Sequence, residues 1–232
     1  MNNFRKELKY NINNYEFILI KESLNKILKK DEHCTNDFYT VSSIYFDNYM
    51  NMAYNQVKCG LSERWKYRIR FYNYDESFIK LEKKYKINNL TNKKETLINK
   101  EILDQILSGS IKISKENDEL LNEFILSMKT EFLKPIIYIE YDRIPYIYRY
   151  DNVRITLDYN IRYTNIVNDV FNKERKMYYL KNKILEVKYN DFIPDFIFKN
   201  INLNNLSQTS FSKFLNSIDS FKGGNLNDTW DL

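Results

Sequence analysis

Two arginines separated by a single residue, Arg68 and Arg70, lie in the segment WKYRIRFYNYDESFIKLEKKYK, residues Trp65–Lys86. Apolar and charged residues alternate on both sides of a polar stretch at 73–77, which predicts a β-hairpin. Successive side chains of a strand point to opposite faces, so the two arginines share one face about 7 Å apart. Like charges this close repel unless an anion lies between them, and guanidinium groups bind phosphate oxygens in pairs. The hairpin therefore indicates a phosphate-type anion site, with an ordinary solvent-exposed charged face as the alternative.

The same alternation recurs in other predicted strands, where cations and carboxylates share the face opposite the apolar residues. Carboxylates placed among cations suit hard divalent metals, which accompany phosphates. The residue types alone thus point to a polyphosphorylated ligand with its metal ion. The charged positions are Glu7, Lys9, Arg68, Arg70, Lys80, Glu82, Lys84, Arg154, Asp158, Glu186 and Lys188.

Amphipathic helices are predicted between these strands, and the apolar strand faces need such helices to cover them. Asn13 or Asn14 is expected to cap the first helix. The segment INNLTNKKETL is either a further strand or the start of a helix, and NYMNMAYNQ is an asparagine-rich segment that follows a predicted strand. Helices are expected at 15–29, 100–107, 114–128 and in a short segment within 209–218; strands are expected at 4–12, 38–47, 65–72, 79–86, 136–148, 153–164 and 183–189.

The fold class that fits this pattern is α+β, a closed antiparallel β tunnel of eight strands with helices packed outside. The charged faces point away from the helices, so they form either bulk surface or the interior of a barrel. A strongly twisted sheet of eight strands can close, which also removes exposed edges. We see no linker and no repeat, and therefore expect one domain at 1–222 followed by a loose tail at 223–232.

Bulk properties exclude several classes of protein. The net charge of +5 permits an anionic partner without requiring nucleic acid, and no base-stacking motif is present. The only histidine, His33, lies in a polar stretch, which argues against a histidine metal site or a Ser-His-Asp triad. Cys34 and Cys59 form no disulfide framework, so a cytoplasmic location is expected. No apolar run approaches the ~20 residues of a membrane span.

Nine short motifs occur in a fixed order over about residues 4–216: RKELKY, SSIYFDN, KYRIRFY, IKLEKKYK, TNKKE, YDRIPY, VRITLD, ILEVKY and FSKF. In this order they resemble the VTC domain, the polyphosphate polymerase branch of the CYTH-like triphosphate tunnel metalloenzymes, in a stand-alone bacterial form. The resemblance implies a tunnel of eight antiparallel strands, open at both ends. Pro145 departs from the family pattern, which usually has a small residue there.

The resemblance also implies an activity and a set of site residues. The activity is metal-dependent transfer of the γ-phosphate of ATP onto a growing polyphosphate chain, with Mn²⁺ or Mg²⁺ as cofactor. Apart from the resemblance, we expect Lys80, Lys83 and Lys86 to be solvated surface residues. The implied catalytic cations are Arg68, Arg70, Lys84, Arg143, Arg154 and Lys213; the implied phosphate contacts are Lys9, Tyr141, Lys188, Ser212 and one of Lys93 and Lys94; the implied metal ligands are Glu186, Glu7 and Glu82.

Two alternatives remain within the same fold. A triphosphatase would hydrolyse inorganic or organic triphosphate, because water then replaces the polyphosphate end as acceptor. A binding module would hold polyphosphate without turnover. The residues leave open the preferred metal, the length of the product, the oligomeric state and a membrane-protein neighbour.

Overall fold

The computed structural model describes residues 6–32, 34, 36–87 and 90–224, so His33 lies outside the described residues. The chain divides into two compact units built from interleaved segments. Unit 1 comprises Met1–Thr40, Tyr141–Ile161 and Tyr179–Ser212; unit 2 comprises Val41–Glu140, Arg162–Tyr178 and Lys213–Leu232. Strands β7 (Lys134–Tyr148) and β8 (Val153–Thr164) contribute residues to both units.

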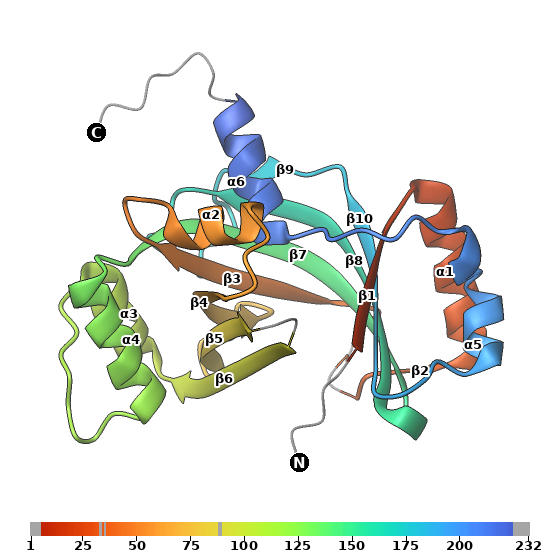
Figure 1. Ribbon diagram of the computed structural model, residues 1–232, viewed down its shortest axis with the longest axis horizontal. Coiled ribbons are helices and arrows are strands. Elements are labelled where there is room, and N and C mark those ends of the chain that lie inside the picture. The colour runs from red at the N-terminus through yellow and green to blue at the C-terminus, as the bar shows by residue number, and fades with distance from the viewer. Residues whose placement is uncertain (1–5, 33, 35, 88–89, 225–232) are drawn as a thin grey trace. The chain divides into compact units, whose positions relative to one another are not determined.

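Unit 1 is an antiparallel sheet with two helices on one face (Figure 1). Its strands are hydrogen-bonded in the order β1-β10-β8-β7, and the short β2 also pairs with β7. Besides parts of β7 and β8, its elements are β1 (Lys6–Ile12), α1 (Asn14–Ile27), β2 (Lys29–Lys30), η1 (Tyr150–Asn152), β10 (Lys183–Tyr189), α5 (Asp195–Asn200) and η2 (Leu203–Asn205). The two-residue β9 (Tyr178–Tyr179) pairs with β8.

The core of unit 1 joins the apolar faces of its strands to helices α1 and α5. Leu24 of α1 and Ile197 of α5 are fully buried against Leu157 of β8 and Val187 of β10. Figure 1 shows the two helices side by side. The charged residues of the same strands alternate with these apolar ones, so the helices leave the charged face uncovered.

Unit 2 repeats this arrangement with different helices. Its strands run in the order β3-β4-β5-β6. Tyr67 and Ile69 of β4 and Leu81 of β5 are fully buried in a core with Phe124 of α4 and Leu103 of α3. The elements are β3 (Tyr39–Asp47), α2 (Met52–Lys58), β4 (Arg64–Tyr72), β5 (Ile79–Ile87), β6 (Leu90–Ile98), α3 (Lys100–Ser108), α4 (Glu119–Thr130) and α6 (Lys213–Gly224).

The predicted α+β class with an antiparallel sheet and outer helices is confirmed. The principal strands follow the order β1-β10-β8-β7-β3-β4-β5-β6. No helix among the described residues is both long and apolar enough to cross a membrane.

Several local predictions were wrong. Helices α2, in the asparagine-rich segment, and α5, which follows Pro194, were not among the predicted helices. Helix α4 begins at Glu119 and not at residue 114, because the Asp118 side chain accepts the amide hydrogen of Leu120 as its N-cap. Helix α6 continues to Gly224, two residues into the predicted tail; residues 225–232 lie outside the described residues.

Candidate functional site

The charged face of unit 2 is built around the buried carboxylate of Glu82 on β5. Arg68 lies directly opposite it on β4, and its Nε and a terminal nitrogen lie 2.6 and 2.5 Å from Glu82 Oε2. Arg70 follows on the same face, with a terminal nitrogen 4.0 Å from Glu82 Oε1. Burial favours the protonated carboxyl, but the two guanidinium groups outweigh it and lower the pKa of Glu82 to about 2. Glu82 therefore holds the two predicted phosphate-binding arginines in place as a fixed anion.

Tyr45 of β3 belongs to this cluster, although the sequence analysis did not select it. It lies opposite Arg68, which donates a 3.3 Å hydrogen bond to its hydroxyl. Burial opposes ionisation, but Arg68, Lys66 and Arg70 together lower the pKa of Tyr45 to about 7. Apolar and charged residues do not alternate in β3, YTVSSIYFD, so no local pattern in the sequence pointed to Tyr45.

Helix α6 begins at the predicted residue Lys213, whereas Ser212 precedes the helix and belongs to unit 1. Phe214, in the first turn of α6, packs its ring 5.0 Å from that of Tyr45. The Lys66 ammonium lies 5.6 Å from the Tyr45 ring centroid and 5.3 Å from that of Phe214. This aromatic contact fixes the start of α6, where Lys213 is the first helical residue.

The register of β6 distinguishes Lys93 from Lys94. Lys93 lies opposite Lys84, on the charged face, and Lys94 lies opposite Lys83, on the helix-covered face. The Lys93 ammonium is 2.5 Å from Glu95 Oε2, which is itself opposite Glu82. Of Lys93 and Lys94, it is therefore Lys93 that lies on the same face as the arginines.

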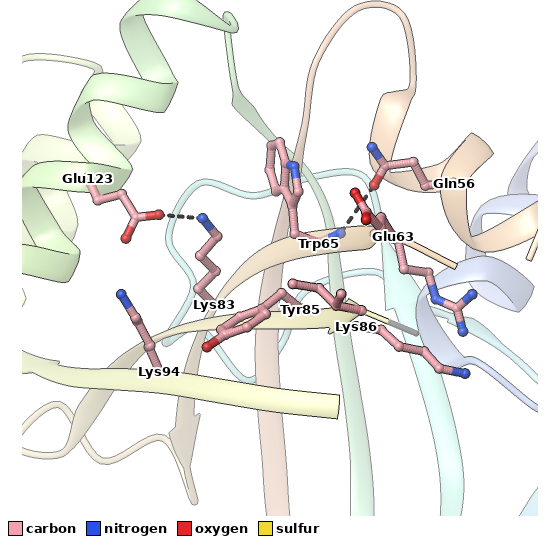
Figure 2. Close-up of a pocket in the computed structure, with 10 residues that line it drawn as sticks. Gln56, Glu63, Trp65, Lys83, Tyr85, Lys86, Lys94 and Glu123 are labelled. Carbon is pink, nitrogen blue, oxygen red and sulfur yellow. Dashed lines mark hydrogen bonds and ion pairs between the residues drawn. The ribbon is translucent and has the colours of Figure 1, made fainter. Parts of the chain in front are cut away.

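A cavity of about 420 Å³ lies beside the start of β4 and the end of β5, and it is lined by Arg64 and Lys86 as well as by Lys83, Lys94 and Glu123 (Figure 2). Figure 2 shows Lys83 pointing toward Glu123 of α4, with which it forms an ion pair. The expectation that Lys83 is a solvated surface residue was wrong, because its side chain is largely buried between Glu123 and the rings of Trp65 and Tyr67. The residues that line this cavity do not include Arg68, Arg70 or Glu82.

On the charged face of unit 1, two carboxylates alternate with two lysines. Lys9 lies 2.8 Å from Glu7 and 3.8 Å from Glu186, and Lys188 lies 2.7 Å from Glu186 and 3.9 Å from Glu7. The register places Lys9 opposite Glu186 and Glu7 opposite Lys188. Burial alone would lower the pKa of Lys9, but Glu186 and Glu7 reverse this effect and raise it. Each charge in this quartet is therefore compensated.

Two arginines complete the charged face of unit 1. Arg143 donates two hydrogen bonds of 2.6 and 2.8 Å to Asp158, which is fully buried, and its pKa lies well above the usual value although burial alone would lower it. The guanidinium also lies 5.2 Å from the ring of Tyr141, a predicted phosphate contact. Arg154 has a terminal nitrogen 3.3 Å from Asp31 and donates to the Tyr39 hydroxyl at 3.1 Å.

Two buried polar atoms of unit 1 have no hydrogen-bond partner among the described residues. They are Nε of Arg154 and Oγ1 of Thr156, two residues apart on the same face of β8. Thr156 lies opposite Glu186. A buried polar group without a partner is costly, and a bound ligand oxygen would satisfy such atoms. The sequence analysis did not select Thr156.

The donors of unit 1 fit a divalent cation only in part. Among the described residues, no group of three or more His, Cys, Asp or Glu side chains is placed to hold a metal. Glu186 and Glu7, however, share one face, and Mg²⁺ is commonly held by one or two carboxylates together with substrate phosphates. Glu82 fits less well, because its two oxygens face Arg68 and Arg70. Its metal role stays a prediction.

The predicted site residues thus divide between the two units, and the shared tunnel stays a prediction. Every predicted site residue on a strand lies on a charged face except Lys94. In unit 1 these are Glu7, Lys9, Tyr141, Arg143, Arg154, Glu186 and Lys188; in unit 2 they are Arg68, Arg70, Glu82, Lys84 and Lys93.

Comparison with known proteins identifies relatives by family and by fold. A family model described as the VTC domain matches residues 4–222. A Bacillus halodurans protein described as a candidate adenylate cyclase superposes with a TM-score of 0.55 at 16% identity, covering 90% of this chain and 95% of that chain. The PH1819 protein of Pyrococcus horikoshii gives a TM-score of 0.49 at 15% identity, covering 93% and 98%. At such identities the likeness concerns the fold alone. No curated protein matches the sequence.

Proposed function

Because the chain belongs to the VTC domain family, we propose that it is a metal-dependent phosphotransferase that extends inorganic polyphosphate with the γ-phosphate of ATP. The observation that supports this proposal is where the arginines implied by the resemblance lie on their strands. Arg68, Arg70, Arg143 and Arg154 all lie on charged faces, and none lies on a helix-covered face. An arginine that only made the protein soluble would not need a buried carboxylate, such as Glu82, to hold its side chain in one orientation.

The proposed mechanism is neutralisation and positioning. The arginines and lysines bind phosphate oxygens, and no covalent protein nucleophile is required. The acceptor is the terminal phosphate of the chain, which is already an anion at neutral pH, so a strong general base is dispensable. Glu82 and Asp158 orient Arg68 and Arg143 before the substrate arrives, which limits reorganisation during the reaction.

Glu186 and Glu7 are the residues that would hold a divalent cation in unit 1. The cation would supply charge neutralisation between phosphates. Lys9 and Lys188, which contact these carboxylates, would then be available to phosphate oxygens. The two partnerless atoms on Arg154 and Thr156 lie beside this quartet and offer further donors.

The test is product analysis with purified protein, ATP and Mn²⁺ or Mg²⁺, with and without a short polyphosphate primer. We expect chains that lengthen on a gel, with ADP released in proportion. Arg68→Ala should lower the rate by about 10- to 100-fold, because one charge-assisted contact contributes about 1.5–3 kcal/mol.

The matched control is Lys94→Ala, which removes a cation from the helix-covered face of β6. It should keep the wild-type rate. Orthophosphate as the sole product would instead assign the protein to triphosphate hydrolysis, and tight polyphosphate binding without turnover under either metal would make it a binding module.

A further inference from the structure

The two charged faces differ in their balance of charge. On the face of unit 1, the four cations Lys9, Lys188, Arg143 and Arg154 meet as many carboxylates within ion-pair distance. On the same face of β4, β5 and β6 in unit 2, eight cations accompany two carboxylates, Glu82 and Glu95. Unit 2 therefore carries a strong excess of positive charge, whereas the face of unit 1 is nearly neutral.

The excess positive charge in unit 2 lies in a row of cross-strand residue pairs on β4 and β5. We call this row the ladder and each cross-strand pair a rung. Like charges directly opposite each other on neighbouring strands destabilise a sheet, and an anion between them relieves the repulsion. Only one rung of this ladder, Arg68 with Glu82, pairs opposite charges. The remaining rungs are Arg64 with Lys86, Lys66 with Lys84, and Arg70 with Lys80.

The ladder continues beyond the predicted site toward the start of β4. Rungs on one face repeat every two residues, so the distance along the strand from Arg70 to Arg64 is about 20 Å. Figure 2 shows the Lys86 side chain extending away from Lys83 and Glu123, and Arg64 and Lys86 line the same cavity as these two residues. No role had been assigned to Arg64, and Lys86 was expected only to be solvated.

We propose that the charged face of unit 2 binds linear polyphosphate without a divalent cation, and that Arg64 and Lys86 form an outer subsite that makes affinity increase with chain length. The nature of the polyanion rests on the proposed function, whereas binding itself does not require transfer. A face already rich in cations needs no metal to attract an anion, while the balanced face of unit 1 does.

The test is calorimetric titration of the whole chain, in EDTA, with tripolyphosphate and with a polyphosphate several times longer. Wild-type protein should bind both, and should bind the longer chain more tightly per phosphate. The double variant Arg64→Gln and Lys86→Gln keeps both side-chain stems. It should lose about tenfold in affinity for the longer chain, as expected for loss of a surface charge-assisted contact, and keep its affinity for tripolyphosphate.

The double variant Lys112→Gln and Lys129→Gln removes two charges from exposed positions outside the ladder, so it serves as the charge-matched control and should change neither affinity. Absence of binding in EDTA at either length would overturn the proposal, as would an equal loss of affinity in the Lys112→Gln and Lys129→Gln control. Single-stranded DNA that displaces polyphosphate at equal concentration would show a general polyanion site. Metal-free binding without chain extension from ATP would refute the polymerase function while leaving the outer subsite intact.

Discussion

Glu82 determines the geometry of the arginine cluster, and its ionisation should be measurable in the stability of the protein. Its pKa is about 2 in the folded state, below the ordinary value of about 4.3 for an unfolded chain. A carboxyl with a depressed pKa stabilises the fold above its unfolded pKa and loses this effect as pH falls through its folded pKa. The contribution is on the order of 3 kcal/mol for a pKa shift from about 4.3 to about 2.

We therefore expect the free energy of unfolding to decrease between pH 5 and 2 more steeply in wild-type protein than in Glu82→Gln. Urea denaturation followed across this range measures both. The difference between the two proteins should be largest above pH 5 and shrink toward pH 2. A difference that stays constant with pH would mean that Glu82 contributes through packing and not through its charge.

At the scale of the element, helix α1 shows how a short polar motif positions a whole face. The Asn13 side chain accepts the Glu16 amide hydrogen at 2.9 Å, and the Glu16 side chain accepts that of Asn13 at 2.8 Å. This reciprocal capping box fixes where α1 begins, and α1 covers the apolar side of unit 1. The sequence allowed either Asn13 or Asn14 as the cap, and the structure selects Asn13.

Asn13→Ala should lower the free energy of unfolding by about 1 kcal/mol, the usual cost of losing an N-cap. Asn14→Ala is the paired control. The Asn14 side chain accepts an exposed hydrogen bond from Lys183. Asn14→Ala should therefore change the free energy of unfolding by no more than about 0.5 kcal/mol. Chemical denaturation of the wild-type protein and the two variants measures these free energies of unfolding. An equal decrease in both variants would contradict the assignment of Asn13 as the N-cap.

At the scale of the whole molecule, the two units share strands. Because β7 and β8 contribute to both units, neither can lose its sheet without disturbing strands that the other uses. We expect one cooperative transition, consistent with the predicted single domain at 1–222. Hydrogen exchange of α1 amides in unit 1 and α4 amides in unit 2 should reach the same limiting free energy with the same denaturant dependence. Distinct limits would indicate two independently folding domains.

The sequence by itself determined which face a residue occupies in those strands whose apolar and charged residues clearly alternate. The alternation of side chains is a property of the extended backbone, so Arg68, Arg70 and Glu186 could be assigned to charged faces without knowing their neighbours. The order of short motifs likewise sufficed to identify the family. The helical periodicity of 120–128 predicted α4, although its start depended on a capping residue that several positions could supply.

Only the tertiary structure decided which charges meet. Asp158 binds Arg143 and Asp31 binds Arg154 because strands and loops distant in sequence come into register, and no local pattern specifies that register. For the same reason the choice between Lys93 and Lys94, and the place of Tyr45 beside Arg68, required the hydrogen-bonded strand pairs. The charge excess of unit 2 and the balance of unit 1 follow from these pairings, because a cation on a strand becomes an anion site or an ion pair according to what lies across from it.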